Sequence, residues 1–176
     1  MVVTLVSVTS FFVALMLMYF FSLKAQITWH RVEIPSPFWV STGLLMLSST
    51  TLEAARYAGW HGRLRSYALW LDATLGLGIG FLVSQVAGWQ TLLAQGIYLQ
   101  RNPHGSMFYM FTGTHALHVF GGLVWLTILT WRAGSLREGR EHSLRRHRAV
   151  MGAAALYWHF MAVLWLCLFG LLLRWR

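Results

Sequence analysis

The sequence predicts an all-α polytopic membrane protein built as a bundle of five transmembrane helices. The chain has 176 residues, of which 57% are apolar and only 11% are Asp, Glu, Lys or Arg, whereas soluble domains carry about 25% charged residues. Its few charges leave five uncharged runs of the length that a membrane-spanning helix needs, about 20 residues. Such runs exclude a soluble globular domain, and they argue against a β-barrel, whose strands are about 10 residues of alternating polarity.

The uncharged runs place the helices along the chain. They cover residues 1–23, 34–52, 73–100, 102–131 and 149–173. From them we expect helices over 2–23, 37–56, 68–90, 106–131 and 149–173, which form a single transmembrane domain over residues 1–176. The first run has no preceding basic residues and exceeds the apolar core of a signal peptide, about 7–15 residues, so we expect a retained helix there.

The basic residues predict the orientation of the bundle. The side that holds the N-terminus and the connections after the second and fourth helices carries nine Arg, against five Lys and Arg on the other side. Because Lys and Arg gather on the cytoplasmic side, we expect a cytoplasmic N-terminus and a periplasmic C-terminus in a bacterial inner membrane. The net charge of +9 follows from the same rule, so we predict no nucleic-acid partner.

Two features inside the spans are interpreted as structural. Small residues recur every four positions along the third helix, at Gly76, Gly80, Ser84 and Gly88, a pattern that lets another helix pack closely. In the second helix, Glu53 and Arg56 lie three residues apart, so their side chains share a face and are expected to pair.

Three histidines lie inside the fourth and fifth spans. His115 and His118 are three residues apart, and His159 follows in the next helix. Imidazoles on two adjacent helices could ligate haem or a metal ion. They could equally form hydrogen-bonded contacts between helices or contact a lipid headgroup. Spacing alone leaves these interpretations open.

The residues around these histidines resemble motifs of the cytochrome c oxidase subunit III family. The run FYMFTGTHALHVFGG at 108–122 is similar to the family signature FF..TG.HG.HV..G, and YWHFMAVLW at 157–165 resembles YWHFVDVVW in its last helix. SSTTL at 48–52 is similar to a serine-rich stretch in the fourth helix of the family. The family's following helix is matched by Leu75 to Phe81 and then Gln85. The resemblance covers nearly the whole chain in order, and implies a member of this seven-helix family without its first two helices.

The resemblance also implies a function. In that family the subunit binds no haem or copper, flanks the catalytic subunit of a haem-copper oxidase and holds phospholipids. This chain is therefore expected to be a non-catalytic subunit III of a respiratory terminal oxidase, with catalytic subunit I, other respiratory subunits and membrane lipids as partners. No catalytic, cofactor or metal site is expected in it. The residues expected to contact lipid or other subunits are His115, His118, Tyr157, Trp158, His159 and Trp165.

The chain departs from the family pattern mainly by losing acidic residues. Val8, Gly88, Gly152 and Ala162 stand at or near positions where the family has a carboxylate. These four side chains cannot hold a proton, so the departures favour a scaffold over a role in proton uptake. Two other functions stay open: a helper subunit of a nitric oxide reductase, and a haem b quinol-oxidising membrane anchor with the histidines as axial ligands.

Overall fold

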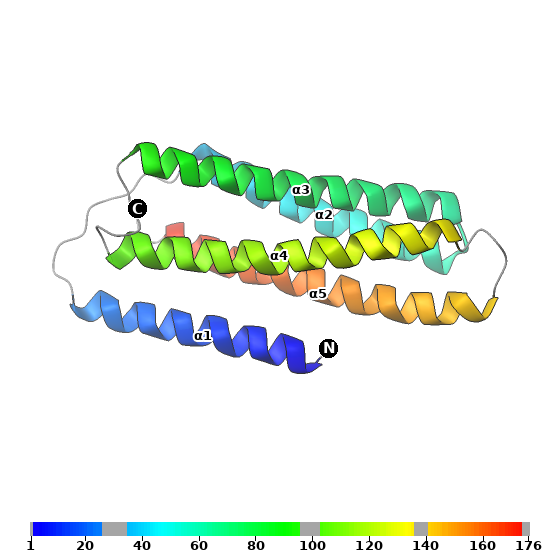
Figure 1. The fold of residues 1–176 in the computed structure, drawn as a ribbon, viewed down its shortest axis with the longest axis horizontal. Helices are drawn as coiled ribbons and strands as arrows, with labels where there is room; N and C mark the ends of the chain where they lie inside the picture. The colour runs from blue at the N-terminus through cyan, green and yellow to red at the C-terminus, as the bar shows by residue number, and fades with distance from the viewer. Residues whose placement is uncertain (1, 26–34, 96–102, 136–140, 174–176) are drawn as a thin grey trace.

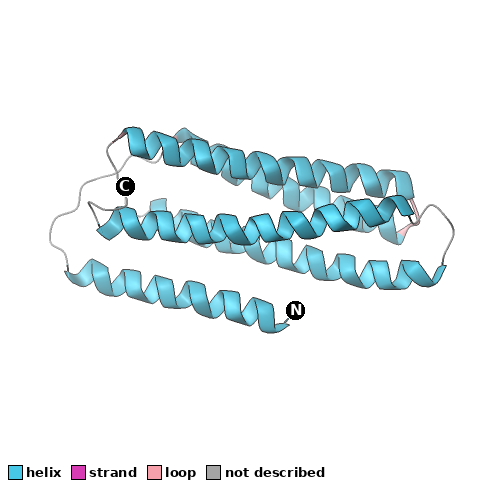
Figure 2. Cartoon of the chain, in the orientation of Figure 1, coloured by secondary structure: helices cyan, strands magenta, loops and turns pink. Residues whose placement is uncertain are grey.

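The computed structural model describes residues 2–25, 35–95, 103–135 and 141–173. Within these ranges the chain forms five α-helices: α1 (Val2–Ala25), α2 (Ser36–Trp60), α3 (Leu64–Ala94), α4 (Pro103–Ser135) and α5 (Glu141–Leu173). The helices lie side by side as an up-and-down bundle, with α1 at one edge (Figures 1 and 2). The predicted all-α fold with five helices is confirmed.

The helices extend beyond the predicted ranges, most clearly at α5, which begins at Glu141 rather than at residue 149. A charged residue ends an apolar run, but Glu and Arg favour helical backbone, so a helix can continue past the apolar segment. The predicted ranges therefore mark the apolar part of each helix and miss its true ends.

A tight turn joins α2 to α3. Gly62 has a positive φ of 69°, which a residue without a Cβ adopts without strain. The Arg63 N–H donates to the Ala58 carbonyl at 3.0 Å, and the Gly62 N–H donates to the Gly59 carbonyl at 3.4 Å. This pair of bonds is a Schellman motif, which satisfies the last carbonyls of α2 and turns α3 back along it.

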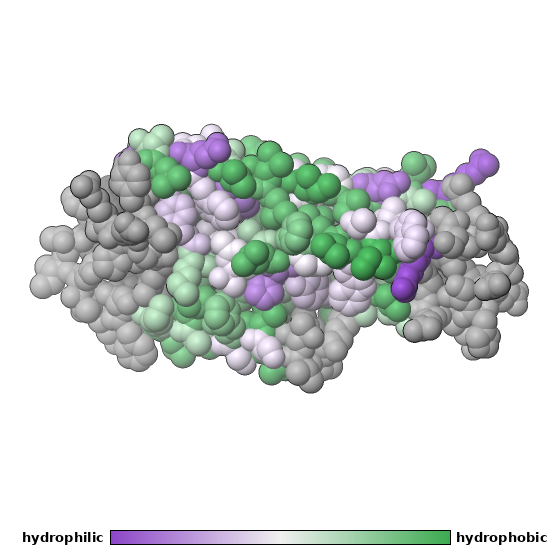
Figure 3. Space-filling view, viewed as in Figure 1, coloured by the Kyte–Doolittle hydropathy of each residue, from purple (hydrophilic) through white to green (hydrophobic). Residues whose placement is uncertain are grey.

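Three helices are long and apolar enough to cross a membrane by length and composition. These spans are Leu64–Ala94, Phe108–Arg132 and Ala149–Leu171. In α1, the apolar stretch with described side chains is the shorter Val6–Met18. α2 is not among these three spans, because its Ser, Thr, Glu and Arg residues lower its mean hydropathy. It nevertheless runs antiparallel to α3 along most of its length (Figure 1). Hydrophobic side chains cover much of the surface over α3 and α4 (Figure 3).

The centre of the bundle is built around two tryptophans of α5. Trp158 and Trp165 are 1% and 0% exposed. Two glycines on neighbouring helices make room for Trp158: a Cβ at Gly78 of α3 would lie 2.9 Å from its ring, and a Cβ at Gly122 of α4 would lie 3.1 Å from it. The indole is thus held between α3 and α4 with its polar edge facing α2.

Candidate functional site: the polar contacts of α2

The inner side of α2 combines apolar and hydroxyl side chains. Its most buried residues recur at alternating spacings of three and four, and all are 0% exposed: Phe38, Ser41, Leu45, Ser48, Leu52 and Ala55. This spacing keeps one stripe of a helix facing its neighbours. The serines therefore bring hydroxyl groups into a region where every polar atom needs a partner.

Two hydrogen bonds connect α2 to the tryptophans of α5. Trp158 Nε1 donates to Ser48 Oγ at 3.0 Å, and Trp165 Nε1 donates to Thr42 Oγ1 at 3.0 Å. Ser48 Oγ donates its own proton to the Leu45 carbonyl at 2.7 Å. The two tryptophans are seven residues apart, or two helical turns, so the pair of bonds fixes the register of α5 on α2.

Hydroxyl and amide groups also connect α2 to α3. Thr51 Oγ1 and Thr74 Oγ1 are 2.9 Å apart, and Gln85 Nε2 donates to Ser41 Oγ at 2.9 Å. Hydrogen bonds of this kind hold helices together in a bilayer, where hydrophobic association gives little help. Ser41, Thr42, Ser48 and Thr51, which we call the polar stripe of α2, therefore help to assemble the bundle.

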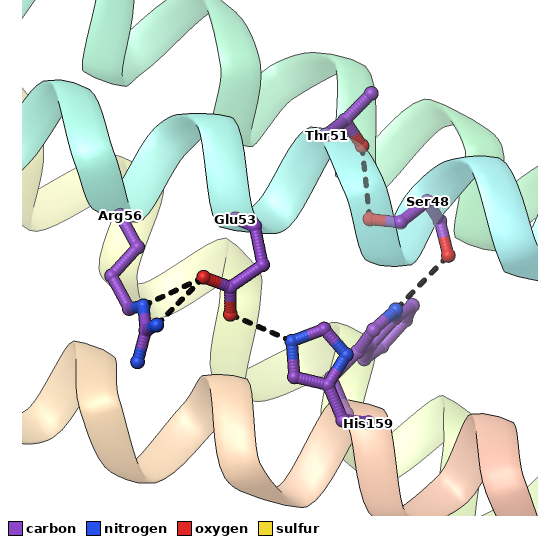
Figure 4. Close-up of polar contacts among 6 residues, drawn as sticks. Ser48, Thr51, Glu53, Arg56 and His159 are labelled. Atoms are coloured by element: carbon purple, nitrogen blue, oxygen red, sulfur yellow. Dashed lines mark hydrogen bonds and ion pairs between the residues drawn. The ribbon is translucent and has the colours of Figure 1, made fainter.

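A carboxylate of α2 links that helix to α5 at the surface of the bundle. Glu53 Oε2 accepts from Arg56 Nη2 at 2.7 Å and from Arg56 Nε at 2.9 Å. Glu53 Oε1 lies 2.8 Å from His159 Nε2, and Figure 4 shows His159 of α5 reaching this carboxylate beside Arg56. An ionised carboxylate only accepts hydrogen bonds, so Nε2 carries the proton. The predicted Glu53–Arg56 pair is confirmed, with His159 as a third member.

Three of the four small residues of α3 face α2, and the fourth faces no other helix. A Cβ at Gly88 would lie 2.7 Å from Phe38, and Ser84 Oγ donates to the Pro37 carbonyl at 2.7 Å. A Cβ at Gly80 would meet only Leu44, at 3.5 Å, and one at Gly76 would meet nothing within 4 Å. Gly80, Ser84 and Gly88 thus face α2, while Gly76 has no neighbour within the bundle.

His115 and His118 have different surroundings. His115 is 0% exposed and lies among three aromatic rings, 5.2 Å from Trp165, 5.9 Å from Phe81 and 6.5 Å from Phe12 between centroids. Neither of its ring nitrogens has a hydrogen-bond partner among the described residues. His118 is partly buried, and its Nδ1 lies 2.7 Å from the Thr114 carbonyl of its own helix.

His115 and His159, which could have shared a ligand, make different contacts. His115 is enclosed by aromatic rings, whereas His159 is bound to Glu53 on the α2–α5 side. In the part of the chain that the structure describes, no group of three or more His, Cys, Asp or Glu residues is placed to hold a metal ion. The arrangement brings polar and aromatic side chains together as contacts between helices.

The six residues expected to contact lipid or other subunits fall into two sets. His115, Trp158 and Trp165 are buried inside the bundle. The others are partly exposed: His118, Tyr157, whose hydroxyl donates to the His118 carbonyl at 2.9 Å, and His159. Only this second set reaches the outside of the bundle.

The sequence did not predict the interhelical hydrogen bonds of four residues. These are Ser41 and Thr42 of the polar stripe, and Thr74 and Gln85 of α3. One signal was available for Ser41, because it falls on the three-and-four spacing that also contains Ser48. No comparable signal marks Thr42 or Thr74, whose partners depend on how the helices are placed against one another.

Comparison with known proteins connects this bundle to a family. The profile of the family described as cytochrome c oxidase subunit III matches residues 1–176. The chain belongs to the cytochrome c oxidase subunit III family. It is 32% identical to cytochrome bo(3) ubiquinol oxidase subunit 3 of Pseudomonas putida, over 74% of this chain and 60% of that protein.

Other members of the subunit III family show similar identity. Cytochrome c oxidase subunit 3 of Thermostichus vulcanus is 33% identical over 76% of this chain and 63% of its own length. That of Corynebacterium diphtheriae is 30% identical over 90% of this chain and 78% of its own length. Against the Pseudomonas putida protein, the chain spans about three fifths of the relative's length.

Proposed function

We propose that this chain is a non-catalytic subunit of a respiratory haem-copper terminal oxidase, where it supports the catalytic subunit and contacts membrane lipid. The observation that carries the proposal is the family match over residues 1–176. The geometry supports it, because the polar and aromatic side chains of α2 and α5 bind one another, as in Ser48–Trp158 and Thr42–Trp165. A bundle so held together is suited to a scaffold.

The haem b anchor is the less favoured function. An axial pair requires two imidazoles facing each other across one haem. Here His115 packs against Trp165 and Phe81, and His159 binds Glu53. Both contacts would have to be given up before the two histidines could share a ligand.

The orientation with a cytoplasmic N-terminus is part of the proposal. The end of α2, the start of α3, the end of α4 and the start of α5 lie at the same end of the bundle (Figure 1). Arg56, Arg63, Arg65 and Arg132 belong to these segments, which agrees with a cytoplasmic location for that end. We further propose that residues 1–176 form one transmembrane domain equivalent to the family's last five helices.

Purification from native bacterial membranes tests the function. The full chain, carrying an affinity tag, is extracted in a mild detergent, and its co-purifying subunits are identified by mass spectrometry. We expect the catalytic subunit of a haem-copper oxidase. Recovery of a nitric oxide reductase subunit in its place would establish the alternative partner. The chain is also purified free of other subunits, and its absorption spectrum is recorded. A Soret band that corresponds to one haem per chain would contradict a non-catalytic role.

A further inference from the structure

The outward side of α3 carries a continuous exposed stripe. Asp72, Gly76, Ile79, Val83 and Val86 follow one another at spacings of four, three, four and three, and all five are exposed. Ile79 is 51% and Val83 64% exposed. We call these five residues the α3 outer seam. α2 and α4 pack against the other sides of α3 (Figure 1), so the seam faces away from the bundle.

The carboxylate of Asp72 distinguishes this seam from an ordinary lipid-facing surface. Asp72 lies inside the Leu64–Ala94 span, seven residues from Arg65, or about 10 Å along the helix. It makes no ion pair or hydrogen bond with any residue that the structure describes. Ionisable side chains within membrane spans are rare and normally pair with another group. Asp72 is therefore free to pair with a group from outside this chain.

The glycine next along the seam is also unused within the bundle. A Cβ at Gly76 would meet nothing within 4 Å, whereas a Cβ at Gly78 would lie 2.6 Å from Leu123 and one at Gly88 would lie 2.7 Å from Phe38. Gly78 and Gly88 are thus needed for contacts inside the chain, and Gly76 is not. A glycine at an exposed position lets the backbone of another helix approach closely.

We propose that the α3 outer seam docks one transmembrane helix of another subunit, which places an Arg or Lys side chain against Asp72. The charge of Asp72 selects the partner. A second copy of this chain on the same seam is disfavoured, since a two-fold contact opposes identical surfaces and would set one Asp72 near the other. A lipid is disfavoured because a flexible acyl chain does not need the close approach that Gly76 permits.

Photo-crosslinking in native membranes tests which molecule occupies the seam. A photoreactive amino acid is placed at Ile79 or Val83, and control probes are placed at Leu117 and Val124, which are 71% and 47% exposed on α4. We expect a polypeptide adduct with a different subunit from the α3 positions, at a yield well above that from the α4 positions. Adducts with lipid alone, or with a second copy of this chain, would overturn the proposal.

Charge substitutions test the role of Asp72 in the same complex. We expect Asp72→Asn to lower recovery of the partner subunit about three- to eighteen-fold in mild detergent, the range for one interhelical hydrogen bond, and Asp72→Glu to retain it. Exchanging the charges, with Asp72→Arg here and the partner's basic residue changed to Glu, should restore recovery. Unchanged recovery with Asp72→Asn contradicts the proposed pairing.

Two glycine substitutions distinguish an effect on partner docking from an effect on folding of the chain. Gly76→Leu fills the seam, and Gly121→Leu on α4 is its matched control, because both glycines are exposed and a Cβ at either meets nothing within 4 Å. We expect only Gly76→Leu to reduce partner recovery, with both variants at normal levels in the membrane. Equal recovery of partner with the two variants counts against the seam.

The inference rests on the proposed function for the identity of the partner, and the two can fail separately. If the unaltered chain recovers no oxidase subunit, the proposed function fails. A polypeptide adduct at Ile79 in that case still places another protein's helix on the seam. If oxidase subunits are recovered but the α3 probes label only lipid, the function stands and the docking surface is wrong.

Discussion

Replacing Gly78 by Ala tests how firmly Trp158 is held in the bundle. A Cβ at residue 78 would lie 2.6 Å from Leu123 Cδ2 and 2.9 Å from Trp158 Cη2. The leucine methyl can rotate away at little cost. The indole cannot, because Nε1 donates to Ser48 at 3.0 Å and its other edge lies 3.1 Å from a Cβ built at Gly122.

The expected size of the effect follows from two opposing contributions. Overfilling a packed core costs about 1–3 kcal/mol, and exchanging Gly for Ala within a helix contributes about 1 kcal/mol in the other direction. We therefore expect Gly78→Ala to lower the free energy of unfolding by about 1 kcal/mol. Gly76→Ala lacks the overfilling and should raise it by about 0.5–1 kcal/mol.

Unfolding of the purified protein in mixed micelles, followed by tryptophan fluorescence, measures both variants. Gly122→Ala provides an intermediate case, because the Cβ would lie 3.1 Å from Trp158 and from Tyr157. The expected order of stability is Gly76→Ala, then Gly122→Ala, then Gly78→Ala. Equal stability of the Gly76 and Gly78 variants would refute the tight enclosure of Trp158.

Two further predictions use the same unfolding measurement. Trp158→Phe and Ser48→Ala should be coupled by about 0.6–1.7 kcal/mol in a double-mutant cycle, the range for interhelical hydrogen bonds in membranes, and additive effects would argue against that bond. His115→Leu should leave stability unchanged or raise it by about 1 kcal/mol, because both imidazole nitrogens are buried without a described partner and an unsatisfied polar group is costly. A large loss of stability in this variant would show that the imidazole has a partner.

The sequence was sufficient for the fold class and for contacts within one helix. The uncharged runs predicted all five helices, and the spacing of Glu53 and Arg56 predicted their ion pair, since three residues along a helix bring side chains to one face. The contact of His159 with Glu53 could not be predicted in this way. It depends on the register of α5 against α2, which the Trp158 and Trp165 hydrogen bonds fix across more than 100 residues of chain.

The stripe of small residues on α3 shows how helical geometry limits a prediction from spacing. A residue four positions along an α-helix has turned about 40° beyond one full turn, because there are about 3.6 residues per turn. From Gly76 to Gly88 the accumulated rotation is about 120°. This rotation carries the stripe from the exposed side of α3 at Gly76 to the contact with Phe38 at Gly88, so one spacing pattern serves two surfaces.

Packing accounts for three of the side chains at positions where the family resemblance implies a carboxylate. A Cβ at Gly88 would lie 2.7 Å from the Phe38 ring, so that position is filled by an aromatic side chain of α2. Val8 and Ala162 are 6% and 4% exposed, within the apolar interior of the bundle. The two carboxylates kept at described positions within the spans, Glu53 and Asp72, lie outside that interior. Glu53 pairs with Arg56 and contacts His159 inside the chain, whereas Asp72 pairs with no residue that the structure describes.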